Sequence, residues 1–437
     1  MTTRHELPPP PHPDAAPRRH GRLTSEVMAG GSVVEKDDDE LVGGWRGALG
    51  VALVAALIGS LALFNIWWFV FVVGLLFFIF MHELGHFTTA RWTGMKATQF
   101  FIGFGPRLWS FRRGETEYGV RAIPAGAFVR IIGMNSMDEV DPADEDRTYR
   151  SKSYPKRMLV ISAGSLMHMI MAVLLLFGVY AIDGESVARD GAQIGTVVDG
   201  GAAEAAGLLP DDVVVAIDGQ AVAAPDDMGS IIQSHDPGDV LVFTVLRDGE
   251  QIGVPVDLGV NTDESSPLYG KAFIGVSSGS YYETVEHSVP GAAVNAVTDI
   301  FPVSWEMTKG AVKVLNPVNI VTHLVNPDTA DIETRPTTLV GVTAISDDVG
   351  DSQGFVGIMY LFAVLNVFVG VFNMFPLLPL DGGHAAIATY ERLREKRGGP
   401  RYYADVSKMM PFAMAVMVLL LSLFTVGLYL DTFHSLG

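Results

Sequence analysis

The residues best suited to chemistry in this 437-residue chain are His82-Glu83-Leu84-Gly85-His86. On a helix, His82 and His86 lie four residues apart, so both imidazoles project from one face and can share a metal ion. Glu83 lies beside them, where a carboxylate can take a proton from a metal-activated water. The spacing therefore predicts a metal site that activates water.

The motif stands at the end of an apolar stretch, because residues 48–80 carry no charged side chain. Ionisable groups at the centre of a bilayer cost about 2.5–3.5 kcal/mol each on insertion scales. Such groups are expected to be paired, to bind metal or to face a water-filled cavity. A chance match in an ordinary helix is the alternative, and this setting favours the metal site.

Composition narrows the class of protein. The chain is 49% hydrophobic, and its apolar residues cluster in long runs, which predicts a polytopic α-helical membrane protein. A net charge of −19, with no basic stripe, argues against a nucleic-acid partner. The chain has no cysteine, so disulfides, thiolate zinc sites and cysteine nucleophiles are excluded. Any metal must be held by histidine and carboxylate.

The N-terminal part divides into a tail and a membrane region. Residues 1–45 are rich in proline and acidic residues and are predicted to be a disordered cytoplasmic tail. Residues 46–90 form the N-terminal transmembrane region with the HELGH motif. As one helix, the apolar stretch through the motif would be about 64 Å long, against a hydrocarbon core of about 30 Å. We predict two spans, 48–63 and 66–90; one long tilted helix is the alternative.

Residues 91–157 are polar and rich in arginine. Apolar and polar residues alternate after a turn at 113–115, which predicts a membrane-associated β-hairpin. Residues 158–182 are the next transmembrane helix, and this helix contains His168. His168 either hydrogen-bonds to a neighbouring helix, the interpretation we favour, or serves the metal site.

The second half of the chain contains a small domain, a linker and then further transmembrane spans. Residues 190–258 read as short strands and one helix, typical of a small soluble domain, and 259–352 as a linker with an amphipathic helical region along the membrane surface. The remaining ranges are a transmembrane helix at 353–390, a loop at 391–410 and a last transmembrane helix at 411–430. Lysine and arginine are dense in 91–157 and 391–408 but sparse between 183 and 355. The positive-inside rule therefore places those basic loops in the cytoplasm and the small domain outside.

A second polar motif interrupts the span at 353–390. Two prolines and paired glycines break the helix before Asp381, and irregular backbone at that depth is tolerated where it lines a cavity or is buried in protein. Catalytic zinc sites usually have three protein ligands, and Asp381 is the best third ligand. A helix N-cap is its alternative role, and His384 is the rival ligand. Asn373 either ends a helix or holds a substrate backbone or oxyanion.

Several motifs, taken in order, resemble the site-2 protease type of intramembrane zinc metalloprotease. The motifs are His82-Glu83-Leu84-Gly85-His86, Gly103-Phe104-Gly105-Pro106, residues 114–120, Asn373 to Pro376 and Pro379 to Gly382. Residues 200–219 carry the core pattern of a PDZ domain. The resemblance covers about 62–430 and is greatest to the bacterial regulator of sigma-factor proteolysis and its actinobacterial relatives.

The resemblance implies that His82, His86 and Asp381 bind Zn²⁺, that Glu83 is the general base and that Asn373 helps to hold substrate. It implies a multi-pass plasma-membrane protease that cuts the transmembrane helix of a single-pass protein, such as an anti-sigma factor, within the lipid bilayer. The PDZ-like domain would bind a peptide terminus, and the hairpin could pair with the substrate by strand addition. The predicted segments together give four core transmembrane helices, a fifth at the N-terminus if 48–63 forms a separate span, and an inserted β-rich PDZ-like domain.

The sequence departs from the family pattern at two places. Pro124-Ala125-Gly126 stands where the family has Pro-Gly-Gly, and Ala163-Gly164-Ser165 with His168 stands where it often has Ala-Gly-Pro and then Asn. These changes concern packing around the site. Two rival functions are a PDZ adaptor with a vestigial site, which would need a lost ligand, and a transporter with a proton relay, for which no inverted repeat is visible.

Overall fold

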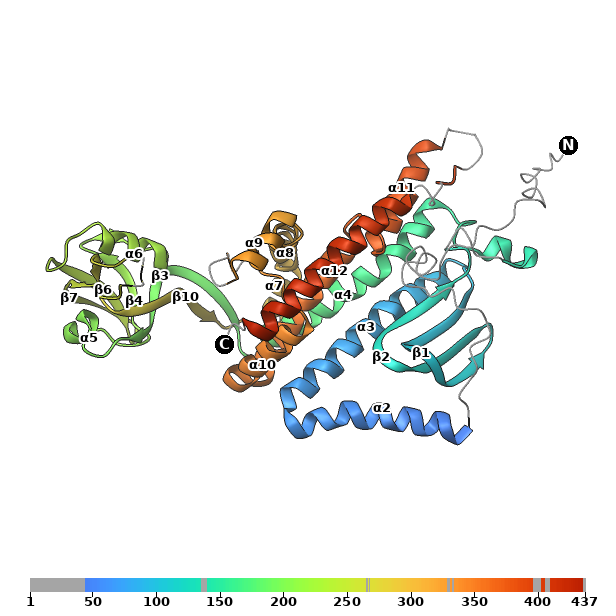
Figure 1. Cartoon of the computed structure of the whole chain (residues 1–437), viewed down its shortest axis with the longest axis horizontal. Coiled ribbons are helices and arrows are strands. Elements are labelled where there is room, and N and C mark those ends of the chain that lie inside the picture. The colour runs from blue at the N-terminus through green and yellow to red at the C-terminus, as the bar shows by residue number, and fades with distance from the viewer. Residues whose placement is uncertain are drawn as a thin grey trace. The chain divides into compact units, whose positions relative to one another are not determined.

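The computed structural model describes residues 44–134, 140–264, 266, 268–327, 331, 334–395, 402–404 and 409–434. The predicted tail at 1–45 lies outside the described residues, except for its last two. The chain forms two compact units, one made of Met1–Gly178 with Ala293–Gly437 and the other of Val179–Ala292 (Figure 1). Each unit is described by itself.

Among its described residues, the first unit contains five helices that are long and apolar enough to cross a membrane. They are α2 (Gly44–Phe64), α3 (Ile66–Trp92), α4 (Tyr154–Ile182), α10 (Leu339–Asn373) and α12 (Met410–Phe433). The predicted polytopic helical fold is confirmed. Asn65 separates α2 from α3 by capping α3, because its side-chain oxygen accepts hydrogen bonds from the backbone N–H groups of Trp67 and Trp68. The apolar stretch therefore forms two helices and not one long helix, and the second of them, α3, carries the HELGH motif.

Helix α10 packs against both α3 and α4 through glycines. A Cβ on Gly74 of α3 would come within 2.2 Å of the Phe362 ring of α10, and a Cβ on Gly370 of α10 would lie 2.6 Å from Met169 of α4. Small residues allow such close approach between helices where no water drives association. The ring of Phe362 also stacks on that of Phe71. This packing places the C-terminal end of α10 beside the HELGH motif.

Shorter helices complete the first unit. They are α7 (Val289–Thr298), α8 (Ile300–Val314), α9 (Pro317–Val325) and α11 (Asp381–Arg394). Helices α7, α8 and α9 lie within 259–352, where the sequence predicts an amphipathic helical region. Helix α10 begins well before the predicted start at 353, and its backbone leaves the helical region at Gly354, where φ is 63°.

The predicted hairpin is confirmed and is longer and more curled than the alternation suggested. Its strands are β1 (Ala97–Arg113) and β2 (Thr116–Ile131). Residues 99–102 of β1 pair with 117–120 of β2 on one side and with 127–130 on the other. Each strand therefore bends back on itself. Gly103 lies at the bend of β1 with φ of 88°, and a Cβ there would meet the Ile123 carbonyl oxygen at 2.7 Å, so only glycine fits.

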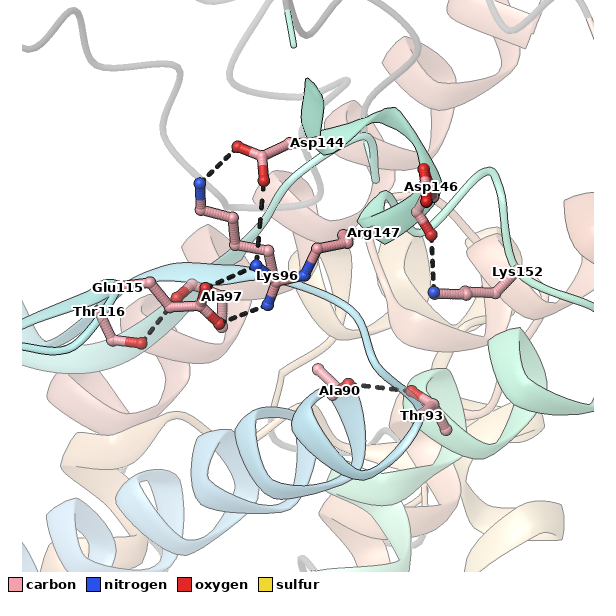
Figure 2. A network of polar contacts seen from close by, with 10 residues as sticks. All are labelled: Ala90, Thr93, Lys96, Ala97, Glu115, Thr116, Asp144, Asp146, Arg147 and Lys152. Atoms are coloured by element: carbon pink, nitrogen blue, oxygen red, sulfur yellow. Dashed lines mark hydrogen bonds and ion pairs between the residues drawn. The ribbon is translucent and has the colours of Figure 1, made fainter. Parts of the chain in front are cut away.

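Ion pairs connect the start of this hairpin and the turn between its strands to the segment that follows it (Figure 2). The 3-10 helix η1 (Pro142–Arg147) supplies Asp144, which pairs with Lys96 at 2.5 Å, and Arg147, which makes two hydrogen bonds to Glu115. Lys152 donates to the Asp146 carbonyl oxygen at 2.7 Å. These contacts fix the hairpin relative to the end of α3.

The second unit is a β-rich domain, as the inserted-domain prediction requires. Its main sheet has the order β10-β3-β4-β6-β7, with β5 paired to β4, and β8 pairs with β9 separately. The strands are β3 (Glu185–Val197), β4 (Val213–Ile217), β5 (Gln220–Ala221), β6 (Val240–Arg247), β7 (Glu250–Asp257), β8 (Gly259–Val260), β9 (Ala272–Phe273) and β10 (Val276–Val285), with helices α5 (Ala202–Ala206) and α6 (Pro225–Gln233). Phe243, Ile194 and Ile217 are fully buried in its core.

This domain extends beyond the predicted range of 190–258. Strand β10 lies in what the sequence suggested was linker, and it pairs with β3 along most of its length. Its run from Val276 to Tyr282 contains three serines and a glycine and is mostly exposed. Backbone pairing rather than apolar alternation holds β10 in place, so the sequence pattern gives no signal for it.

Asp212 and Arg247 of this domain form an ion pair whose carboxylate is buried. Asp212 is 1% exposed and accepts two hydrogen bonds from Arg247, at 2.7 and 2.6 Å, and one from the Leu209 backbone N–H. Burial alone would raise the pKa of Asp212, but the bonds from Arg247 and Leu209 hold it below its ordinary value. The pair therefore stabilises the fold above the unfolded pKa of an aspartate and loses that contribution as the pH falls through the lower folded value.

We expect Arg247→Met to destabilise the β-rich domain by about 2–3 kcal/mol, because it leaves a buried carboxylate without its cation. Hydrogen exchange of the β4 and β6 amides in the full-length protein measures the loss. Arg189→Met is the matched control, since Arg189 pairs with Glu283 where both side chains are about half exposed, and we expect less than about 1 kcal/mol there. Equal effects of the two changes would contradict the assignment.

Candidate metal centre

Three side chains from two distant segments converge where α3, α4 and the start of α11 meet. Nε2 of His82 lies 3.1 Å from Nε2 of His86, and each of these atoms lies 3.4 Å from Oδ2 of Asp381. The three side chains are between 9% and 18% exposed. About 300 residues of sequence separate the histidines from the aspartate, so the packing of α10 against α3 is what brings them together.

The spacing of these atoms suits zinc. Four ligands at 2.0–2.1 Å in a tetrahedron lie about 3.3 Å from one another, and the three atoms here form a triangle with edges of 3.1–3.4 Å. Oδ2 of Asp381 and Nδ1 of His82 are buried without a hydrogen-bond partner among the described residues. Two imidazoles and one carboxylate form a typical catalytic zinc set with one position left for water. The residues present fit a Zn²⁺ ion.

The ring of His86 is held in the orientation that a metal ligand needs. Nδ1 of His86 lies 2.7 Å from the carbonyl oxygen of Val160 on α4. A carbonyl only accepts, so Nδ1 carries the proton and donates, and Nε2 keeps its lone pair directed toward His82 and Asp381. Helix α4 thus selects the tautomer of His86.

Gly164 of α4 forms the floor under both imidazoles. A Cβ at this position would come within 2.3 Å of Cε1 of His82 and 2.5 Å of Nε2 of His86. Gly85, inside the HELGH motif, makes the reciprocal contact, because a Cβ there would lie 2.7 Å from the Ala163 carbonyl oxygen. The two glycines allow α3 and α4 to approach closely at the ligands.

The turn after α10 positions Asp381, and Asp381 is not the N-cap of α11. It is the first residue of α11, whose N-cap is Leu380, and its side chain makes no capping bond. The alternative N-cap interpretation is therefore wrong. The next residue, Gly382, passes so close to the turn that a Cβ would meet the Phe375 carbonyl oxygen at 2.2 Å. The paired glycines thus let α11 start directly against the broken segment.

The other predicted residues fall around this cluster. The Glu83 carboxylate, one residue from His82, accepts a hydrogen bond from the Val129 backbone amide of β2. His384 is half-buried, and its buried Nε2 atom has no hydrogen-bond partner among the described residues, but it does not belong to the group of ligand atoms within 4.8 Å of one another. Asn373 is the last residue of α10 and is half-buried, eight residues before Asp381.

His168 makes the interhelical hydrogen bond that its lone position in a span suggested. Nδ1 of His168 lies 2.8 Å from Oδ1 of Asn366 on α10, whose own Nδ2 donates to the Phe362 carbonyl oxygen at 2.8 Å. The His168 ring also lies 5.1 Å from that of His82, centroid to centroid. Asn366 was missed in the sequence, although an amide within the charge-free run at 355–375 was a usable signal.

An apolar cavity of about 630 Å³ opens beside the metal centre. It is lined by residues of α4, α8, α10 and the turn after α10: Ser162, Ser165, Leu166, Met169, Thr308, Gly370, Val371, Met374, Phe375 and Pro376. Ser165 directly follows the floor residue Gly164. The cavity is large enough for one or two side chains of a bound segment.

Two histidines, a carboxylate and an adjacent glutamate, set among membrane-spanning helices, define a metallopeptidase of the membrane-embedded class. Comparison with known proteins agrees. The model of peptidase family M50 matches residues 70–420, so the chain belongs to this family, the site-2 protease family, and is a zinc metalloprotease of that type. The resemblance found in the sequence is confirmed.

The most informative relatives are curated bacterial proteins. The zinc metalloprotease Rip1 of Mycobacterium tuberculosis is 32% identical over 382 residues, which cover 80% of this chain and 93% of that protein. Rip1 of Mycolicibacterium smegmatis is 30% identical over 389 residues, covering 81% and 94%. Among solved structures, the PDZ domain of an SdrC-like protein of Listeria monocytogenes is 23% identical with a TM-score of 0.19, covering 21% of this chain and 90% of that one.

Proposed function

We propose that the protein hydrolyses peptide bonds within the transmembrane segments of single-pass membrane proteins, anti-sigma factors being the substrate class that the family resemblance supports. The observation that carries the proposal is the convergence of the ligand atoms of His82, His86 and Asp381 within 4.8 Å of one another, at the ends of apolar spans. A site built there is accessible to a bond that lies in the bilayer.

In this proposal His82, His86 and Asp381 hold Zn²⁺. Zinc, when bound, lowers the pKa of a coordinated water to about 7 and polarises the peptide carbonyl. Glu83 accepts the proton of the attacking water and passes it to the nitrogen of the leaving amine. Glu83 remains oriented during both transfers because the Val129 amide donates to its carboxylate.

The substrate side is supported by two features near the site. The apolar cavity beside Ser165 and Met374 suits a hydrophobic side chain of an unwound helix, and Asn373 at the end of α10 offers an amide to the extended backbone. Strand β2 reaches Glu83 through Val129, so the hairpin is placed to pair with an extended segment by strand addition. The excess of lysine and arginine in 91–157 supports a cytoplasmic hairpin and an extracytoplasmic β-rich domain that binds a peptide terminus.

The ligand assignment predicts opposite outcomes for two neighbouring residues. We expect Asp381→Asn to lower zinc affinity by at least about 100-fold, more than the loss of an outer partner of a ligand usually costs, because a neutral amide replaces the anionic ligand. His384→Gln should keep one zinc per chain, since His384 lies outside the ligand group. Metal analysis of the purified proteins after dialysis against a weak chelator measures both. Loss of zinc only from the His384 variant would reverse the assignment.

The function is tested with full-length protein reconstituted in liposomes with a single-pass substrate of known sequence. We expect new termini, mapped by mass spectrometry, that fall within the hydrophobic segment of the substrate. Cuts confined to its soluble parts would contradict intramembrane cleavage. In cells, comparison of the wild-type strain with a strain lacking the protein and with one carrying Glu83→Gln identifies the substrate, because uncut membrane stubs accumulate in the last two.

A further inference from the structure

A second, polar cavity lies in the first unit, where α4 begins and α11 ends. Its volume is about 310 Å³. It is lined by Arg150, Lys152, Ser153, Tyr154, Pro155, Arg157, Arg392, Glu395, Tyr402 and Tyr403. Four cationic side chains and one carboxylate therefore line the cavity, and three of the cations pair with Glu145, Glu391 and Glu395. No step proposed for peptide hydrolysis uses them.

Arg157 is the buried member of this set. Its side chain is 8% exposed, and its Nη1 donates to Glu391 of α11 at 2.6 Å. Its Nε is buried without a hydrogen-bond partner among the described residues. A buried guanidinium with spare donors is costly unless a further acceptor reaches it. The cavity provides the space for that acceptor.

Lys152 adds a positive charge that no carboxylate of the described residues pairs with directly. Its Nζ donates to the backbone carbonyl of Asp146 (Figure 2). Burial is the main cause that lowers the pKa of Lys152, and the nearby charges of Lys156 and Asp146 act on it in opposite directions. Arg392, by contrast, pairs with Glu395 at 2.8 Å while remaining 60% exposed, so it is free to turn toward another anion.

The remaining lining groups, and the position of the cavity at the start of α4, indicate which kind of anion it would bind. Ser153 and Tyr403 add hydroxyl donors to the cations, a combination that suits the several acceptor oxygens of a phosphate group. The cavity adjoins the first residues of the α4 span, where lipid headgroups lie, and its tyrosines are typical of the membrane interface. The basic residues predict that this end faces the cytoplasm, whose leaflet is rich in anionic lipid.

We propose that this cavity binds a phosphate group, carried by the headgroup of an anionic phospholipid or by a soluble phosphate compound. The phosphate bridges Lys152 and Arg157 at the start of α4 to Arg392 at the end of α11. Since α4 carries Gly164 and α11 carries Asp381, the bound phosphate braces the two helices that complete the metal centre.

The test uses delipidated full-length protein and two probes. Native mass spectrometry with dioleoyl phosphatidylglycerol, and with dioleoyl phosphatidylcholine as the neutral lipid, measures retained lipid, and the thermal unfolding midpoint with and without inorganic phosphate measures free anion binding. We expect selective retention of phosphatidylglycerol, and about fivefold weaker retention in Lys152→Gln and in Arg392→Gln, the effect of one basic residue near an anionic headgroup. Lys156→Gln is the matched control, because Lys156 is exposed in the same segment and does not line the cavity.

The outcomes separate the two sources. Stabilisation by inorganic phosphate that is lost in Lys152→Gln supports a soluble phosphate compound as the ligand. Selective retention of phosphatidylglycerol without a response to inorganic phosphate supports the lipid. Equal retention of both lipids with no effect of inorganic phosphate, or identical behaviour of Lys152→Gln and Lys156→Gln, overturns the proposal.

Discussion

Glu83→Gln should leave the protein folded and loaded with zinc but reduce cleavage of a membrane-embedded substrate by about 10³-fold or more. General-base catalysis contributes typically 10²–10⁴-fold, and glutamine cannot accept the proton of the attacking water. The three proposed ligands are unchanged, and the glutamine oxygen can still accept the Val129 N–H that Glu83 accepts. The loss should therefore appear in turnover and not in stability.

The measurement pairs single-turnover cleavage in liposomes with metal analysis of the same preparation. Glu306→Gln is the matched control, because Glu306 makes the same chemical change on α8 with its side chain 63% exposed, and we expect wild-type turnover from it. A Glu83→Gln enzyme that cuts at the wild-type rate would show that another group is the base. An inactive variant that has also lost its zinc would instead make Glu83 part of the metal-binding set.

The sequence alone predicted the membrane helices, the hairpin and the residues that now converge, because each carries a local signal. Apolar length predicts a span, alternation predicts paired strands, and ionisable residues in an apolar run are costly enough to mark a site. His82, His86 and Asp381 stand out for that last reason. Their approach to within 3.4 Å was expected because two histidines leave a catalytic zinc site short of a ligand, and the resemblance implied the same three residues.

The features that the sequence could not predict are contacts between helices or strands that lie far apart along the chain. The Val160 carbonyl that holds His86 is a backbone atom, so no residue type announces it. Asn366, an amide in an apolar run, indicates a polar contact, but its partner His168 can be named only when α4 and α10 are known to pack together. Strand β10 was missed because its pairing with β3 involves backbone groups and largely exposed side chains.

Gly164→Ala should disrupt the metal centre by the addition of a single methyl group. The added carbon would lie 2.3 Å from Cε1 of His82 and 2.5 Å from Nε2 of His86, so either both rings move or α4 withdraws from α3. A withdrawal would also separate His86 from the Val160 carbonyl. We expect zinc affinity to fall by at least about 100-fold, since losing an outer-shell partner alone costs about 10–100-fold, and cleavage should fall with it.

Gly178→Ala on the same helix separates this effect from a general intolerance of alanine in α4. A Cβ at Gly178 would meet only the end of the flexible Met359 side chain, which can swing aside at little cost. We expect normal zinc content and turnover from that variant. Because Gly164→Ala acts on the ligands by position and not by charge, excess zinc should restore part of its activity, whereas it should not restore Glu83→Gln. Full zinc binding and activity in Gly164→Ala would show that the two imidazoles are not held against α4 as described.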